Sequence, residues 1–207
     1  MSDPRTALVG AGYDAMADTW ETWSARIESD PRREWLAELV ARLPAGGQVL
    51  ELGCGNGTDE TRELAASFRL TGIDLSSEQL RRARHRVPSA DFVQADIATV
   101  EFEPASFDGV CAFYVLNHFP RDLLTALFER VQTWLRPGGV FLAALGVGDE
   151  AGWHGEWLGV PMFFSSFPAE TNTRLIVAAG FEPLRNEVVA IDEPEGSVEF
   201  QWILATR

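Results

Sequence analysis

The stretch VLELGCGNGTDE at residues 49–60 constrains the fold of this chain more than any other. An apolar run with strand character leads directly into Gly53, Gly55 and Gly57, which stand at alternate positions. Glycine reaches backbone conformations that other residues avoid, and it lets a ligand approach the main chain closely. A helix that begins after such a loop presents unpaired backbone N–H groups. The stretch therefore predicts a strand, a glycine loop and a helix that together hold a nucleotide-like cofactor.

Strand-like and helix-like patterns alternate after residue 46. Five apolar runs have the length of buried strands: residues 48–52, 70–74, 91–94, 109–114 and 140–145. Helical patterns lie between most of these runs, after Gly57, from Ser76 and over residues 120–135. Ser76 and Gln79 have the spacing of a capping box at the start of the second helix. Such alternation predicts an α/β fold with a doubly wound, mostly parallel sheet.

The last part of the chain predicts an antiparallel pair that closes this sheet. A helical pattern at residues 170–179 precedes two strand-like runs, at residues 188–191 and 198–205. The six residues between these runs have the length of a hairpin connection. We therefore expect the final strand to be antiparallel to its neighbours.

The region before residue 46 is predicted to be helical. Apolar residues recur there at spacings of three and four, which predicts one helix with its buried stripe at Tyr13, Met16, Trp20, Trp23 and Ile27. A second helix is expected around Trp35, Leu36, Leu39, Val40 and Leu43. The length of 207 residues favours one domain. We expect a helical cap over residues 1–45 and a cofactor-binding core over residues 46–207, with a short lid insert at about 146–168.

Charge and composition exclude several kinds of partner. The balance of 17 basic against 31 acidic residues gives a net charge of −14, which opposes nucleic-acid binding. The basic run at residues 81–86 fits the solvated face of a helix. No apolar run has the roughly 20 residues that cross a membrane. Residues 1–5 lack a secretion pattern and the two cysteines have no metal-ligand spacing, so we expect a cytoplasmic monomer or homodimer.

An acid after the second predicted strand narrows the choice of cofactor. Asp74 follows Gly57 by 17 residues and is placed to accept hydrogen bonds from ribose hydroxyls. Dinucleotide sites have glycines spaced G-x-G-x-x-G, whereas here the third glycine comes one residue early. Glu51 adds a negative charge that suits an ammonium group better than a pyrophosphate. The residues therefore favour a cofactor with a ribose, an adenine and a cation.

At this point an ordered series of motifs resembles the class I S-adenosylmethionine-dependent methyltransferases. VLELGCGNG is followed by LTGIDLS, FVQADIATVEF, FDGVCAFYVLNHF, LRPGGVFLAAL and AAGFEPLRNE. The resemblance extends over nearly the whole chain from about residue 48. It implies a Rossmann-like sheet of seven strands, with the last strand antiparallel, and S-adenosylmethionine as the cofactor, converted to S-adenosylhomocysteine.

The resemblance also implies cofactor contacts in the loops that follow the strands. Those residues are Glu51, Gly53 and Gly55 near the methionine part, with Cys54 in the same loop, Asp74 on the ribose with Leu75 beside it, Asp96 and Ile97 at the adenine, Tyr114 at the methyl-donor end, and Tyr13 closing over the cofactor from the N-terminal helix. Leu75 and Ile97 also fit a packing role, and Asp74 and Asp96 also fit roles as caps of turns or helices.

Two segments are predicted to hold a small-molecule methyl acceptor. His118 follows the fourth strand and has an ordinary pKa of about 6.5, which suits a general base, although packing against the next helix is the alternative. The predicted lid supplies a second candidate base, His154, and aromatic side chains for the acceptor: Trp153, Trp157, Phe163 and Phe164. Several of these rings also fit a core role. No metal is expected, because no spacing suggests ligands.

Three functions remain open from the sequence. The leading interpretation is methyl transfer to an oxygen or nitrogen of a small molecule such as a secondary metabolite. The second is a catalytically silent protein that binds or senses S-adenosylmethionine. The third, a nicotinamide-dependent oxidoreductase, is disfavoured by the early third glycine and by Glu51.

Overall fold

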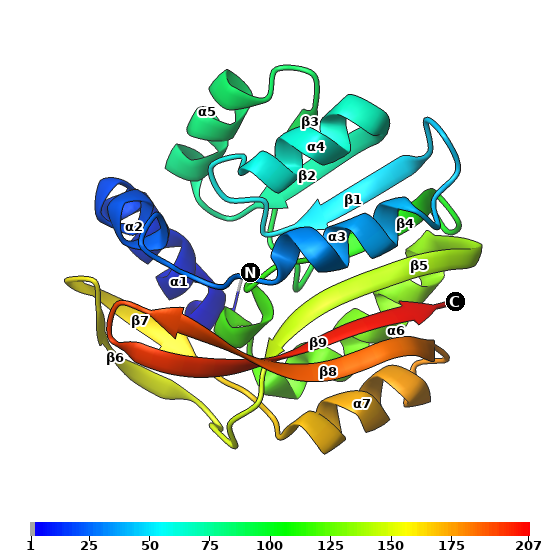
Figure 1. The fold of residues 1–207 in the computed structure, drawn as a ribbon. Coiled ribbons are helices and arrows are strands. Elements are labelled where there is room, and N and C mark those ends of the chain that lie inside the picture. The colour runs from blue at the N-terminus through cyan, green and yellow to red at the C-terminus, as the bar shows by residue number, and fades with distance from the viewer. Residues whose placement is uncertain (1–2) are drawn as a thin grey trace.

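The computed structural model describes residues 3–207. Seven strands form one sheet in the order β3-β2-β1-β4-β5-β9-β8 (Figure 1). Their bounds are Asp91–Gln94 for β3, Arg69–Asp74 for β2, Gln48–Leu52 for β1, Phe107–Ala112 for β4, Leu135–Gly146 for β5, Gly196–Thr206 for β9 and Glu182–Glu193 for β8. Strand β9 is antiparallel to both of its neighbours, and the other pairs are parallel. The predicted fold class is therefore confirmed.

Helices cover both faces of the sheet. Their bounds are Arg32–Val40 for α3, Asp59–Ser67 for α4, Ser77–Arg86 for α5, Leu124–Trp134 for α6 and Ala169–Ala178 for α7, with 3₁₀ turns at Leu116–His118 and Arg121–Leu123. Successive strand residues alternate between two cores. Phe141 packs with residues of α6 and α7 on one face, whereas Leu142 packs with residues of α3 and α4 on the other.

The N-terminal region forms two helices where the periodicity predicted one. Helix α1 covers Pro4–Ala15 and α2 covers Ala17–Ser24. Met16 lies between them with non-helical backbone angles (φ −100°, ψ 13°), and its side chain is buried with Val9 and Met162. Burial of this one side chain turns the chain, so the stripe expected on one helix is divided between two.

Two further segments differ from their predicted form. The expected lid contains a separate hairpin, β6 (Trp153–Trp157) with β7 (Val160–Phe164). The strands of the C-terminal hairpin are longer than predicted. Phe200 is the first residue of β9 that pairs with β5, and residues 196–199 before it pair only with β8. In Figure 1 the tip of this hairpin projects from the sheet toward the N-terminal helices and the β6–β7 hairpin.

Two arginines of the basic run on α5 pair with acids of the N-terminal region. Arg82 contacts Asp18 at 2.6 Å and Glu21 at 2.9 Å, and Arg86 also contacts Glu21. These ion pairs join α5 to α2. No helix among residues 3–207 combines the length and apolar character that crossing a membrane requires.

Candidate active site

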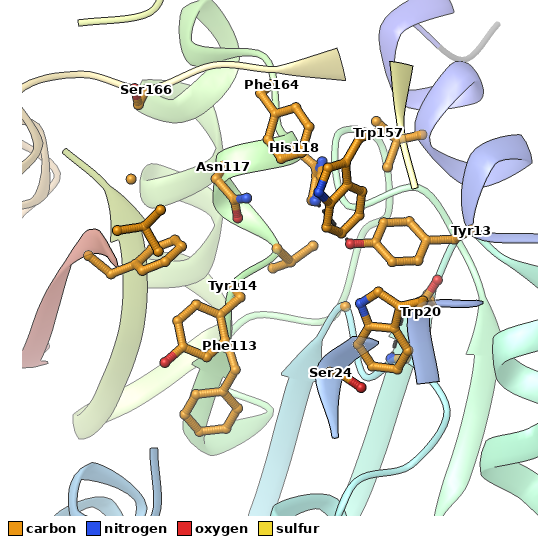
Figure 2. Close-up of a pocket in the computed structure, with 18 of the residues that line it drawn as sticks. Tyr13, Trp20, Ser24, Phe113, Tyr114, Asn117, His118, Trp157, Phe164 and Ser166 are labelled. Atoms are coloured by element: carbon orange, nitrogen blue, oxygen red, sulfur yellow. Dashed lines mark hydrogen bonds between the residues drawn. The ribbon is translucent and has the colours of Figure 1, made fainter. Parts of the chain in front are cut away.

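A cavity of about 520 Å³ opens where the parallel strands of the central sheet end (Figure 2). Carboxyl ends of strands are the usual position for ligands in an open α/β sheet. The predicted site residues that line it are Tyr13, Glu51, Gly53, Cys54, Gly55, Asp74, Leu75, Ile97, Tyr114, His118, Trp157 and Phe164. The fold thus brings together residues from helix α1, from the ends of strands β1, β2, β3 and β4, and from the lid hairpin.

The glycine loop has the backbone that its sequence suggested. Gly53 and Gly55 have φ angles of 66° and 53°, which side chains disfavour. A Cβ atom on Gly53 would lie 2.4 Å from Val115, so the loop packs closely against the segment after β4. A Cβ on Gly55 would meet only Trp20, at 3.9 Å, and Gly55 lines the cavity. Without a side chain at position 55, the backbone of the loop is accessible from the cavity.

Asp74 joins this loop to the end of β2. Its two carboxylate oxygens accept hydrogen bonds from the backbone N–H groups of Gly55 and Ser76, each at 2.9 Å. A carboxylate has about four acceptor positions, so capacity for further hydrogen bonds is left. Burial raises the pKa of Asp74 above its usual value. The side chain both fixes the loop and presents acceptors at the cavity.

Glu51 is buried in the cavity wall with one oxygen unpaired. Its residual exposure is 3%, Thr61 donates a hydrogen bond to Oε1 at 3.1 Å, and Oε2 has no partner. Burial raises the pKa of Glu51 to about 8, with Thr61 and Arg32 opposing the shift. Burial therefore favours the protonated carboxyl, and an approaching cation would favour the ionised one.

Arg32 is a wall residue that the sequence interpretation missed. It lies at the start of α3 and pairs with Asp30 at 2.7 Å and with Glu60 at 3.6 Å. Its guanidinium carbon lies 5.0 Å from the ring centre of Tyr114, and its Nε has no partner. Arg32 lies far from the glycine loop in sequence, and no spacing could have assigned it to the site.

Tyr114 lies in the same cluster but not on a strand. Strand β4 ends at Ala112, two residues before it, and Tyr114 has a φ of 55°. Its hydroxyl donates a hydrogen bond to Asp30 at 2.8 Å. The unusual backbone turns the ring into the cavity wall, where Figure 2 shows it opposite Tyr13 and His118.

His118 is buried and paired with Tyr13. Its Nδ1 lies 3.0 Å from the carbonyl oxygen of Phe163, which can only accept, so Nδ1 carries the proton. Nε2 is then an acceptor, and the Tyr13 hydroxyl 2.9 Å away donates to it. Burial lowers the pKa of His118 to about 4, below the ordinary value on which the general-base expectation rested. His118 accepts the hydrogen bond that orients the Tyr13 hydroxyl, and its burial opposes protonation of the ring.

Asp96, expected at the adenine, does not line the cavity. It accepts hydrogen bonds from Thr6 Oγ1 and from the backbone N–H of Ala98, both at 2.8 Å. These contacts attach α1 to the loop after β3. Its neighbour Ile97 does line the cavity, and so does Leu75.

Gln79 is a second wall residue that the sequence did not reveal. The capping box predicted with Ser76 forms only in part: Ser76 Oγ accepts the Gln79 backbone N–H, while the Ser76 N–H donates to Asp74. The Gln79 side chain is 1% exposed, lines the cavity, and has no partner at its amide oxygen or nitrogen. Buried amides without partners are rare, so this group is available to a ligand.

Of the predicted residues in the lid hairpin, some line the cavity and others do not. Trp157 and Phe164 line the cavity with ring centres 5.5 Å apart, edge to face. Phe163 is buried in the hydrophobic cluster with Met16, and Trp153 is 40% exposed. His154 is exposed and packs beside Phe163 outside the cavity. Alternation along β6 and β7 turns His154 and Phe163 away from the face that carries Trp157 and Phe164.

The tip of the β8–β9 hairpin forms a further wall. Glu193, Val198 and Phe200 of this hairpin line the cavity. Trp23 Nε1 donates a hydrogen bond to Glu195 at 2.7 Å, which attaches the tip to α2. The sequence predicted a hairpin there and gave no indication that its tip reaches the site. Residues 3–207 contain no group of three or more His, Cys, Asp or Glu side chains that could hold a metal ion.

Comparisons with known proteins agree with this architecture. Residues 49–139 match a family described as methyltransferase domain. The chain is 34% identical to 27-O-demethylrifamycin SV methyltransferase of Amycolatopsis mediterranei, over 67% of this chain and 58% of that protein. It is 37% identical to trans-aconitate 2-methyltransferase of Paracidovorax citrulli, over 58% of this chain and 48% of that protein. The chain thus spans about half the length of the curated relatives it matches.

A solved structure has the same fold over the whole chain. It is the Burkholderia thailandensis 1,6-didemethyltoxoflavin-N1-methyltransferase with bound 1,6-didemethyltoxoflavin and S-adenosylhomocysteine. The TM-score is 0.73 with 21% identity, and the match covers 100% of this chain and 91% of that chain. At this identity the likeness shows the fold alone.

Proposed function

Since the chain belongs to the class I S-adenosylmethionine-dependent methyltransferases, we propose that it transfers a methyl group from S-adenosylmethionine to an oxygen or nitrogen of a small molecule. The observation that carries the proposal is the set of unpaired buried polar atoms around the glycine loop. Glu51 Oε2, Arg32 Nε and the Gln79 amide all belong to cavity-wall residues and have no partner within the protein. They match the charged and polar parts of this cofactor.

Each part of the cofactor has residues of suitable chemistry in the wall. The Glu51 carboxyl suits the methionine ammonium, and the Arg32 guanidinium suits the methionine carboxylate. Asp74 has acceptor capacity left for ribose hydroxyls. The Gln79 amide is both donor and acceptor, which suits the edge of an adenine whose faces pack on Leu75 and Ile97.

When bound, the cofactor supplies a sulfonium-activated methyl group. The chain itself excludes water and aligns the acceptor, which are the main contributions a protein makes to such a displacement. Tyr13 and His118 form one fixed pair beside the loop, with the tyrosine oxygen at the cavity and its proton directed to His118. Trp157 and Phe164 cover the opening from the lid side (Figure 2).

A small molecule is the proposed acceptor for reasons of size and charge. The cavity lies within the range of about 300–1,000 Å³ that is usual for small-molecule sites. The Amycolatopsis relative is named for methyl transfer at an oxygen and the solved structure for transfer at a nitrogen, each on a small molecule. The net charge of −14 disfavours a nucleic-acid substrate.

Calorimetry with S-adenosylmethionine, S-adenosylhomocysteine and NAD tests the cofactor. We expect the two adenosyl ligands to bind and NAD to bind much more weakly; tighter binding of NAD would refute the proposal. Release of S-adenosylhomocysteine with a panel of hydroxyl- and amine-bearing metabolites tests turnover. Binding without release for any acceptor would favour the catalytically silent alternative.

A further inference from the structure

The part of the cavity beyond the glycine loop is walled by aromatic rings. Tyr114 and Phe200 pack edge to face with ring centres 4.8 Å apart. Trp157 packs in the same way against Trp23, at 5.2 Å, and against Phe164. All five residues line the cavity. Such walls accept flat apolar molecules, and their faces attract cations.

The same wall is rich in acids and poor in cations. Glu150, Glu193 and Glu199 line the cavity in addition to Glu51 and Asp74. Among residues 3–207, Arg32 is the one permanently cationic side chain in the wall, and it is paired with two carboxylates of its own. Since like charges in a partly buried site repel, an anionic acceptor would find no free cation there.

Glu193 holds a particular position among these acids. It is the last residue of β8, at the hairpin tip that Trp23 attaches through Glu195. The backbone N–H of Glu28 also donates to the carbonyl of Asp192, so the tip is fixed on both sides. Burial and the neighbouring Glu195 raise the pKa of Glu193 to about 7, with no opposing hydrogen bond or cation.

Glu193 lines the cavity together with two tyrosines, Tyr13 and Tyr114. The pKa values of Tyr13 and Tyr114 are raised mainly by burial, next by Asp74 and Asp30 respectively, and to a smaller extent by the negative charge of Glu193. Tyr13 donates its proton to His118, and Tyr114 donates its proton to Asp30. Neither hydroxyl proton is therefore available to Glu193, and the carboxylate is left to receive a proton from a ligand.

We propose that the Glu193 carboxylate receives the N–H or O–H of the methyl acceptor, and that this acceptor is a flat aromatic or heteroaromatic molecule that is neutral or cationic. The inference rests on the proposed function. The acceptor heteroatom bonds to the methyl carbon as the carbon–sulfur bond breaks. The bonding pair stays on sulfur, which gives S-adenosylhomocysteine, and the displaced proton passes to Glu193.

The test uses a series of acceptor analogues matched in shape and different in charge. Naphthalene, indole and quinoline each carry an amine, a hydroxyl or a carboxylate on the same side chain. Binding is measured by calorimetry to the full chain saturated with S-adenosylhomocysteine. We expect amines and alcohols to bind at least about tenfold more tightly than the matching carboxylates, the size of a charge effect in a partly buried site.

Glu193→Gln should reduce the preference for amines and alcohols over carboxylates about tenfold. The affinity of this variant for S-adenosylhomocysteine should be unchanged, and that result would also show that the variant folds. Asp192→Asn is the matched control, because it removes one charge from the same tip at an exposed residue outside the cavity wall. This control should keep the preference.

The pH dependence of the rate is a second test. For any member of the series that is methylated, the rate should rise through about pH 7 in the wild type, the range in which Glu193 ionises beside Glu195, Tyr13 and Tyr114. That rise should be lost in Glu193→Gln.

Equal or tighter binding of the carboxylates would overturn the inference, and so would an unchanged preference in Glu193→Gln. Failure of every member of the series to bind the S-adenosylhomocysteine-loaded protein would overturn it as well. Failure of S-adenosylhomocysteine itself to bind would instead refute the proposed function.

Discussion

Cofactor binding should release a proton from Glu51. In the ligand-free protein burial holds the pKa of this carboxyl at about 8, so about 0.9 of the molecules carry the proton at pH 7. An ammonium group at the unpaired Oε2 would favour the ionised form and return the pKa toward its ordinary value of about 4.3. Binding at pH 7 should therefore release about 0.9 proton.

The same linkage sets the pH dependence of affinity. Between pH 6 and pH 7 the protonated fraction of ligand-free Glu51 changes little, while the bound form stays ionised. The affinity for S-adenosylhomocysteine should then rise about ninefold over this interval. The α-ammonium group of the ligand stays protonated over this interval, because α-amino groups have an ordinary pKa above 7.

The assay is calorimetry at pH 7 in buffers of different ionisation enthalpy. The slope of the observed enthalpy against the buffer enthalpy gives the number of protons released. Glu51→Gln should abolish the slope, whereas Asp59→Asn, which removes an exposed acid at the start of α4, should retain it. A slope near zero in the wild type, or an equal slope in Glu51→Gln, would refute the reasoning.

Three further outcomes are expected. Asp74→Ala should weaken binding of S-adenosylhomocysteine by about 1–3 kcal/mol in calorimetry, the scale of hydrogen bonds to a charged group, and unchanged affinity would exclude a ribose role. Gln79→Leu should weaken the same binding by about 1 kcal/mol while raising the unfolding free energy, because two unpaired buried atoms disappear; equal affinity would remove Gln79 from the cofactor site. The folded pKa of His118, about 4, lies below its unfolded value of about 6.5, so its contribution to stability is lost as pH falls through this window. Urea unfolding at pH 7.5 and 5 should therefore show a loss about 2 kcal/mol larger in the wild type than in His118→Gln, and an equal loss in both would contradict a buried neutral histidine.

The fold could be predicted from the sequence because strands, helices and the glycine loop are specified by residues close together in the chain. The strand, glycine loop and acid of residues 48–74 depend on spacing along one βαβ unit, and the structure has them as expected. The break at Met16 could not be predicted, because it depends on a pocket formed with Met162, almost 150 residues later in the chain. The same holds for β4, which ends before Tyr114 where the apolar pattern continues.

The candidate site was predictable only where its residues follow strands. Arg32, Gln79 and Glu193 lie on two helices and a hairpin tip. Each is proposed to bind a ligand because part of its polar group has no partner within the fold: Nε of Arg32, the amide of Gln79 and the carboxylate of Glu193. Residue type alone cannot show this, since arginines, glutamines and glutamates are mostly solvated. His154 and Asp96 illustrate the converse: each has suitable chemistry and a suitable position in sequence, and neither lines the cavity.

The two candidate proton acceptors of the cavity, His118 and Glu193, differ in their surroundings. His118 is enclosed, its Nε2 is occupied by Tyr13, and burial lowers its pKa to about 4. Glu193 is half-buried, unpaired, and has its pKa raised to about 7. Burial disfavours the charged form of either group, so it weakens a histidine as a base and strengthens a carboxylate. The effect of burial therefore supports the proposal in which His118 positions the Tyr13 hydroxyl and Glu193 receives the proton, although the sequence favoured the histidine.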